Sequence, residues 1–247
     1  MFKSISFFEK DLGVDKRIAR FFVDRRVPKE NAYWKGRLIY ISSGNGYNIM
    51  PIFYDILYRI GIPLESLLEE QHILFMEEIL HLAALEETKV IDKATELSTI
   101  TGLLKGRIKD EAAFARLHAY LSQPRPLPTG EFGTPYPALN RADNFLFVLC
   151  DLPVTEAQWK LALRYWYAVI TTILLLDDLS DYEKDKREGE ENAVLEMGEG
   201  IEGFRKAEIL MSEAAVTLNE ISPAFSAVAQ ISFDHKKDFI PAEYVPR

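Results

Sequence analysis

The chain has 247 residues, of which 48% are hydrophobic and 12% aromatic, enough for one large domain with a sizeable core. Its net charge of −9 argues against a general nucleic-acid binder, since no basic field covers the chain. The single cysteine, Cys150, excludes intramolecular disulfides and a cysteine-rich metal site.

The first half of the sequence predicts helices separated by glycine and proline. We expect an amphipathic helix around residues 10–23 and a helix over residues 49–60, ended by Gly61 and Pro63. Over residues 64–104 apolar side chains recur at intervals of three and four, which predicts a long helical stretch with at most one break. Residues 109–122 predict a further helix.

The second half continues the helical pattern after one long loop. Residues 123–137 hold five prolines and two glycines, which predicts a loop long enough to serve as a flap. Helices are expected at about residues 139–150, 156–186, 201–219 and 223–233. No segment alternates convincingly enough for a sheet. The prediction is therefore an all-α, single-domain helical bundle over residues 1–247.

The hydropathy pattern bears on the compartment. The first residues lack a sustained apolar stretch before their charges, and the longest strongly apolar run, residues 168–176, is far shorter than the roughly 20 residues that span a bilayer. We therefore expect no signal peptide, no transmembrane segment and a cytoplasmic protein. The lone cysteine fits a reducing compartment.

The sequence DDLSDYEKDKREGEENAVL places three aspartates, Asp177, Asp181 and Asp185, at every fourth residue. On a helix this spacing puts all three on one face, where like charges repel. Sequences usually accept such a cost where a hard cation is held, and Mg²⁺ prefers carboxylates together with substrate phosphates. The stripe therefore predicts metal–diphosphate chemistry, with a solvated helix end as the plain alternative.

This segment resembles the second metal-binding motif of class I isoprenoid synthases. Asp177, Asp181 and Asp185 stand where bacterial terpene synthases have the Asn, Ser and Glu that bind metal. The DDxxD form, Asp177 to Asp181, is closer to trans-prenyl diphosphate synthases, and squalene/phytoene synthases use a related spacing, so the subfamily stays open. Other residues in register are Asp178, Leu179, Lys184, Gly189, Glu190, Asn192 and Val194.

The resemblance implies a bundle of the isoprenoid synthase type with a central apolar cavity. It implies an enzyme that uses Mg²⁺ to ionise a prenyl diphosphate, followed by cyclisation or prenyl coupling. Asp177, Asp181 and Asp185 would be metal ligands, and the protein would be a homodimer or a heteromer with a related synthase. The residues expected to contact or orient the diphosphate and its metal are Lys184, Lys186, Arg187 and Asp178.

The family also carries an earlier acidic motif, for which residues 78–92 are the best candidate. They resemble the prenyl synthase pattern Glu-x-x-His-x-Ala-x-Leu-x-x-Asp-Asp-x-x-Asp, but Thr88 and Lys89 stand in the places of the paired aspartates. Asp92 remains as a candidate metal ligand. This degenerate motif leaves a second hypothesis, a non-catalytic prenyl-diphosphate binder or a regulatory subunit, and a third, an acidic helical protein without an isoprenoid role.

Aromatic residues near the aspartates allow two interpretations. They could line a cavity that tolerates a carbocation through cation–π attraction. Ordinary core packing is the favoured interpretation for any one of them. The residues are Phe145, Phe147, Tyr165, Trp166 and Tyr167.

Overall fold

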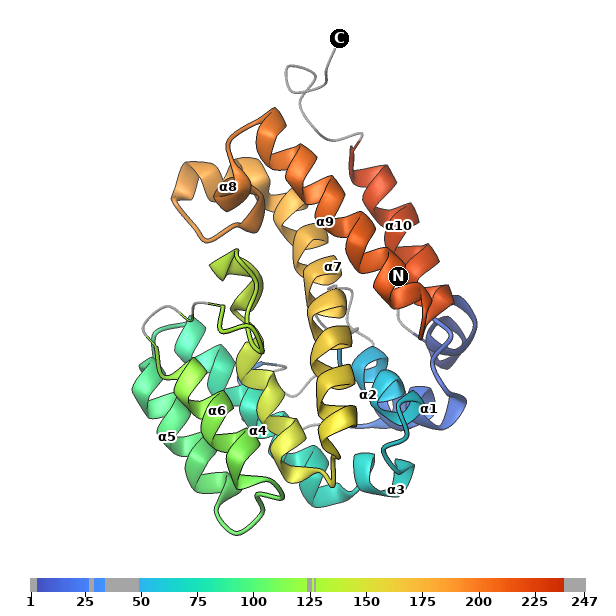
Figure 1. Cartoon of the computed structure of the whole chain (residues 1–247), viewed down its shortest axis with the longest axis vertical. Coiled ribbons are helices and arrows are strands. Elements are labelled where there is room, and N and C mark those ends of the chain that lie inside the picture. Colours follow the sequence, from blue (N-terminus) through green and yellow to red (C-terminus); the bar gives the residue numbers. More distant parts are fainter. Residues whose placement is uncertain (1–3, 27–28, 34–48, 124–125, 127, 238–247) are drawn as a thin grey trace.

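The computed structural model describes residues 4–26, 29–33, 49–123, 126 and 128–237, and all regular secondary structure in them is helical. Within these ranges the chain forms ten α-helices, α1 to α10, three short helices of other types, and no strand. The elements pack into one helical body (Figure 1). The all-α prediction is therefore confirmed.

A single long helix, α7 (Glu156–Glu188), runs through the middle of the molecule (Figure 1). Its 33 residues correspond to a rise of about 50 Å. Thr155 caps its first turn in a capping box with Gln158, and Gly189, in the left-handed region at φ 70°, ends it. The residues from Ala168 to Leu176 are all buried, so this stretch is enclosed by protein on every side.

The other helices form two groups around α7 (Figure 1). One group contains α4 (Glu70–Glu87), α5 (Lys93–Leu104) and α6 (Glu111–Leu121), which pack around the short helix η5 (Asp143–Asp151). The other contains α8 (Ala193–Met197), α9 (Ile201–Asn219) and α10 (Pro223–Lys237), all three against α7. Near the start of α7 lie α1 (Lys16–Asp24), α2 (Ile49–Arg59) and α3 (Leu64–Leu67), with α2 packed on α7. The remaining short elements are η1 (Phe7–Asp11) and η4 (Pro137–Asn140).

Two predicted helices are divided where polar residues cap the backbone. The expected helix over residues 10–23 is instead η1 and α1, separated by Gly13 at φ 71° and by Asp15, which accepts the Arg17 N–H as N-cap. The stretch over residues 64–104 is three helices, α3, α4 and α5, so the expectation of at most one break is wrong. At its second break Lys89 takes a positive φ of 58° and Asp92 caps α5.

The segment predicted as a helix over residues 139–150 is mostly a 3₁₀-helix, η5, of nine residues. Runs of this type beyond three or four residues are uncommon, because the hydrogen-bond geometry is poorer than in an α-helix. Both ends of η5 are fixed by side-chain hydrogen bonds. Asp143 accepts from three aromatic side chains at one end, and Asp151 bonds His72 and Arg107 at the other.

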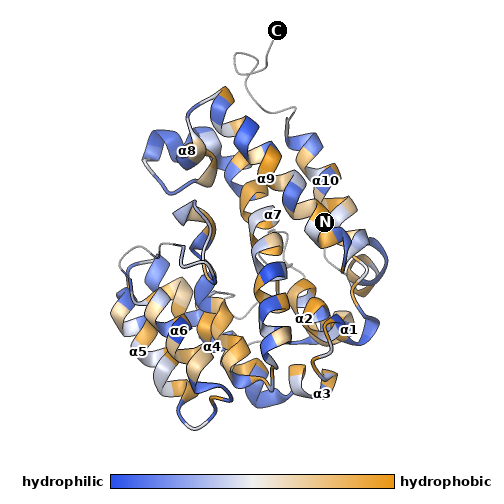
Figure 2. Ribbon diagram, viewed as in Figure 1, coloured by the Kyte–Doolittle hydropathy of each residue, from blue (hydrophilic) through white to orange (hydrophobic). Residues whose placement is uncertain are grey.

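By length and composition alone, helix α7 could cross a membrane. The apolar run over residues 168–176, considered alone, predicts no transmembrane segment. Of its most apolar 18-residue stretch, 78% is buried inside the protein, which is also typical of a core helix. Figure 2 shows hydrophilic residues gathered around α8 and hydrophobic ones on α2 and α4, against the core.

Candidate functional site

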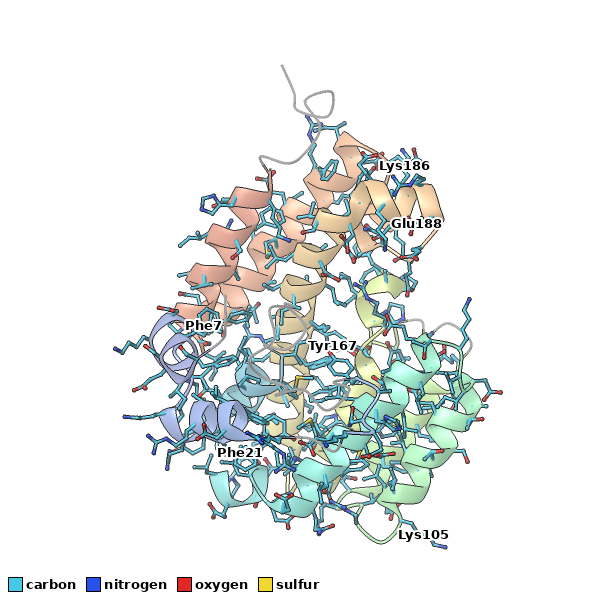
Figure 3. The ribbon with its side chains drawn as sticks, turned by 180° about the vertical axis from the view of Figure 1, so that it is seen from behind. Phe7, Phe21, Lys105, Tyr167, Lys186 and Glu188 are labelled. Carbon is cyan, nitrogen blue, oxygen red and sulfur yellow. The ribbon has the colours of Figure 1, made fainter. Side chains whose placement is uncertain are left out.

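The predicted aspartate stripe lies in the last third of α7, directly after its fully buried stretch. Asp177 and Asp181 are exposed, with 56% of the Asp177 side chain accessible, whereas Asp185 is 6% exposed. Figure 3 shows the adjoining Lys186 and Glu188 at the outer end of the helix, far from the interior residue Tyr167. The stripe thus runs from the edge of the core to the outer end of α7.

Asp178, next to the stripe, is tied into the structure. It is 2% exposed, and its carboxylate accepts hydrogen bonds from Arg141 Nη2 at 2.8 Å and from the Ala193 backbone N–H at 2.7 Å. Burial disfavours the charge of Arg141, but the bond to Asp178 and the nearby negative charges of Asp178, Glu191 and Asp177 together raise the pKa of the guanidinium. Asp178 therefore holds η4 and α8 against α7.

Asp185 has a similar structural partner. Asn192 Nδ2 donates to Asp185 Oδ2 and to the Asp178 backbone oxygen, each at 2.8 Å. The other amide atom, Asn192 Oδ1, accepts the N–H groups of Val194 and Leu195 and so caps α8. With Gly189, this arrangement closes the turn between α7 and α8. Several residues that carry the resemblance thus have a local structural role.

Asp177 and Asp181 remain as the accessible carboxylates, one helical turn apart. Arg141 Nη2 lies 3.9 Å from Asp177 Oδ2, and Lys236 of α10 donates to Ser180 Oγ and to the Leu176 backbone oxygen, which adjoin the pair on α7. Burial raises the pKa of Asp177, opposed by the charge of Arg141 and reinforced by Asp181 and Asp178. The pair is therefore flanked by one cation from the η4–η5 connection and one from α10.

The three predicted diphosphate contacts each lie beside an acidic neighbour on the surface. Lys184 Nζ is 3.3 Å from Glu190, Lys186 Nζ is 3.0 Å from Glu199, and Arg187 Nη2 is 3.3 Å from Glu188. Exposed pairs of this kind contribute little to stability, so they can exchange for another anion at small cost.

The candidate first motif is not assembled as a metal site. Asp92 caps α5, accepting the Thr95 N–H at 2.8 Å, and α5 packs mainly on α4 and η5. His81 Nδ1 accepts the Ala32 N–H at 2.7 Å. Over the described part of the chain, no group of three or more His, Cys, Asp and Glu side chains could hold a metal ion. The structure therefore does not bring Asp92 together with the stripe.

The aromatic residues near the stripe pack against one another. Phe145 stacks on Trp166 with centroids 5.5 Å apart, and Phe53 meets Trp166 edge-on at 5.1 Å. Phe147 lies 6.0 Å from Phe114. Tyr165 is buried, and the Tyr167 hydroxyl is hydrogen-bonded inside the core. These contacts are ordinary core packing.

These contacts decide which of the aspartates can bind Mg²⁺. A site of three aspartates does not fit, because Asp185 is buried and bonded to Asn192. Two accessible carboxylates, Asp177 and Asp181, do fit a Mg²⁺ that completes its shell with water and substrate phosphate oxygens. The arrangement can thus hold a metal only together with an anionic ligand.

Two flanking cations, Arg141 and Lys236, were not predicted. Arg141 is the only basic residue between Arg125 and Lys160, in a stretch that is otherwise mostly apolar, which is a signal that a buried acid requires it. Lys236 carries no such signal, because two further basic or titratable residues adjoin it in the sequence His235–Lys237.

Comparisons of the chain with protein-family models, with curated proteins and with solved structures found no match.

Proposed function

We propose that the chain is a Mg²⁺-dependent enzyme of the class I isoprenoid synthase type, which ionises a prenyl diphosphate for cyclisation or prenyl coupling. The observation that carries this proposal is the accessible pair Asp177 and Asp181 at the point where α7 leaves the core. The sequence around the pair resembles the second metal-binding motif of class I isoprenoid synthases, and this resemblance supports the same proposal. We propose in addition that the helices form a bundle of the isoprenoid synthase type with a central apolar cavity.

In this proposal Asp177 and Asp181 would hold Mg²⁺, which supplies neutralising charge for the departing diphosphate. Arg141 and Lys236 add positive charge on either side of the pair. Lys184, Lys186 and Arg187 reach the diphosphate by exchanging their surface partners. The buried apolar stretch of α7 before Asp177 would supply the water-free surroundings that the carbon skeleton needs once the substrate is bound.

The test is incubation of the purified chain with C10 to C20 prenyl diphosphates and Mg²⁺, with release of inorganic pyrophosphate as the measurement. We expect release with at least one chain length, and its loss in Asp177→Ala and in Asp181→Ala. Lys160→Ala, an exposed change near the opposite end of α7, is the matched control and keeps the activity. No release at any chain length from folded protein would contradict the proposal.

A second candidate is a non-catalytic prenyl-diphosphate binder or a regulatory subunit of a related synthase. It is favoured by the first motif, where Thr88 hydrogen-bonds its own helix, Lys89 turns the chain and Asp92 caps α5. This candidate predicts binding without turnover by the isolated chain, or turnover only after a partner synthase is added. The cytoplasmic location and the dimeric or heteromeric state are part of the same proposals.

A further inference from the structure

A carboxylate with only neutral partners lies in the core, outside the candidate site. Asp143, the first residue of η5, is 0% exposed. Its Oδ1 accepts from Trp166 Nε1 at 2.8 Å, and its Oδ2 accepts from the hydroxyls of Tyr120 at 2.7 Å and Tyr167 at 3.1 Å. The Asp143 cluster, as we call these four residues, joins η5, α6 and α7.

Unlike Asp143 and Asp185, whose partners are neutral, the other buried carboxylates in the described part of the chain have a cationic partner. Such pairs are Asp55 with Arg59 at 2.6 Å, Glu77 with Arg25 at 2.5 Å and Glu96 with Lys93 at 2.6 Å. Asp143 has no ion pair within the described part of the chain. Lys93 acts on Asp143 only through space, because its ammonium group bonds Glu96.

Burial without a cation favours the protonated acid. Burial raises the pKa of Asp143 to about 6, although the bonds from Trp166, Tyr120 and Tyr167 act in the opposite direction. The phenols do not take over the charge, since burial and the neighbouring Asp143 raise the pKa of Tyr120 and of Tyr167 as well. The groups that face Asp143 are therefore two neutral phenols, one indole and the more distant Lys93.

The cluster also reaches the segment after the proline-rich loop. The Tyr167 hydroxyl accepts the Gly133 N–H at 2.7 Å, and Phe132 stacks on Tyr120 with centroids 5.3 Å apart. Gly133 takes a positive φ of 83°, and a Cβ there would lie 2.9 Å from the Tyr120 hydroxyl. Asp143 and its partners thus lie where η5, α6, α7 and this segment contact one another.

We propose that Asp143 is a pH-sensitive switch in the core, whose protonation on mild acidification stabilises the folded chain at the place where η5, α6, α7 and residues 129–136 meet. The sign follows from linkage. The folded chain binds this proton more tightly than the unfolded chain, whose aspartates titrate at their ordinary value. The contribution of Asp143 to stability therefore rises as pH falls from about 6 toward 3.8, and above that range the ionised carboxylate is a cost.

The first experiment is denaturant unfolding of the wild type and Asp143→Asn between pH 7.5 and 4.5. Because the amide does not titrate, the wild-type folding equilibrium constant should rise relative to that of Asp143→Asn by about 30-fold over this range. A ratio that stays constant, or that falls with decreasing pH, would overturn the proposal.

The second experiment does not depend on the folding of Asp143→Asn. Infrared spectra of the folded wild type should show a protonated carboxylic acid band that appears with a midpoint near pH 6. Tyr120→Phe removes one donor from the carboxylate and should move the midpoint upward. Tyr58→Phe, which removes a hydroxyl bonded to Arg17 at the surface, should leave it unchanged. A carboxylate that stays ionised down to pH 4.5, or a midpoint that Tyr120→Phe does not move, contradicts the switch.

Discussion

Adjacent aspartates on α7 have different surroundings because a helix turns by about 100° per residue. Asp178 points at Arg141 and the start of α8, whereas Asp177 lies on the accessible face with Asp181. The paired aspartates of the motif are thus divided between one side chain that holds the fold and one that is free to bind a ligand.

This division predicts that substitution of Asp178 lowers stability, whereas substitution of Asp177 removes the proposed activity. Asp178→Ala should lower the free energy of unfolding by about 2–3 kcal/mol, somewhat below the value for a fully buried pair because Arg141 is 27% exposed. Asp177→Ala, the matched control, should change it by less than about 0.5 kcal/mol while removing the proposed activity. Denaturant unfolding of both variants checks this. Equal losses of stability would contradict the separation.

The residues of the stripe could be predicted, but their individual roles could not. A spacing of four residues indicates that the aspartates share a helix face. Whether each carboxylate binds metal or holds a turn depends on partners that are distant in sequence. Arg141 is 37 residues before Asp178, and Tyr120 is 23 residues before Asp143. The Asp143 cluster was missed for the same reason, although an acid at the start of the apolar run FLFVLC hints at a buried partner.

At the scale of elements, α8 and α9 approach each other through Gly203. An added Cβ at this position would lie 2.0 Å from the Gly198 oxygen and 2.5 Å from the Val194 oxygen. Both atoms belong to backbone, which cannot turn aside as a flexible side chain does. The turn between α8 and α9 is therefore built around the missing side chain.

Gly203→Ala should consequently destabilise the protein by about 3 kcal/mol or more, as overpacking against backbone does. Gly102→Ala in α5 is the matched control, because nothing lies within 4 Å of its added Cβ. It should be neutral or stabilising by up to about 1 kcal/mol, from helix propensity. Thermal and denaturant unfolding of the two variants test this. A tolerated Gly203→Ala would show that α8 does not pack as described.

Helices with long periodic patterns could be predicted, and those defined by capping could not. The predicted helix over residues 201–219 coincides with α9, and α7 contains the whole helix predicted over residues 156–186. Helix α8 was missed because its five residues are too short for a period. The 3₁₀ form of η5 was also missed, since its end contacts, such as Asp151 with His72, join residues far apart in sequence.

At the scale of the whole molecule, the charge is unevenly placed. Much of the acidity behind the net charge of −9 lies in the sequence from Asp177 to Glu202, along the end of α7 and α8. A diphosphate approaching this end meets repulsion unless a divalent cation neutralises it. Metal and diphosphate should therefore bind together rather than separately.

Mg²⁺ with a non-hydrolysable prenyl diphosphate analogue should raise the melting temperature by about 5–10 °C at a hundredfold excess over Kd. Either ligand alone should leave it nearly unchanged. Asp177→Asn should abolish the shift without lowering the melting temperature of the free protein. Differential scanning calorimetry measures all three. An equal shift in Asp177→Asn would place the ligand elsewhere.

The central position of α7 has a consequence for how the chain reaches its native state. Gln158, in its first turn, donates to the Ile60 backbone oxygen, 98 residues earlier, and α2 packs along the same helix. Helix α2 therefore lacks its main packing partner until α7 has been synthesised. Contacts between segments so far apart in sequence form slowly, because a long loop must be closed first. Until then the apolar side chains of α2 are exposed to water, which favours aggregation or chaperone binding during synthesis.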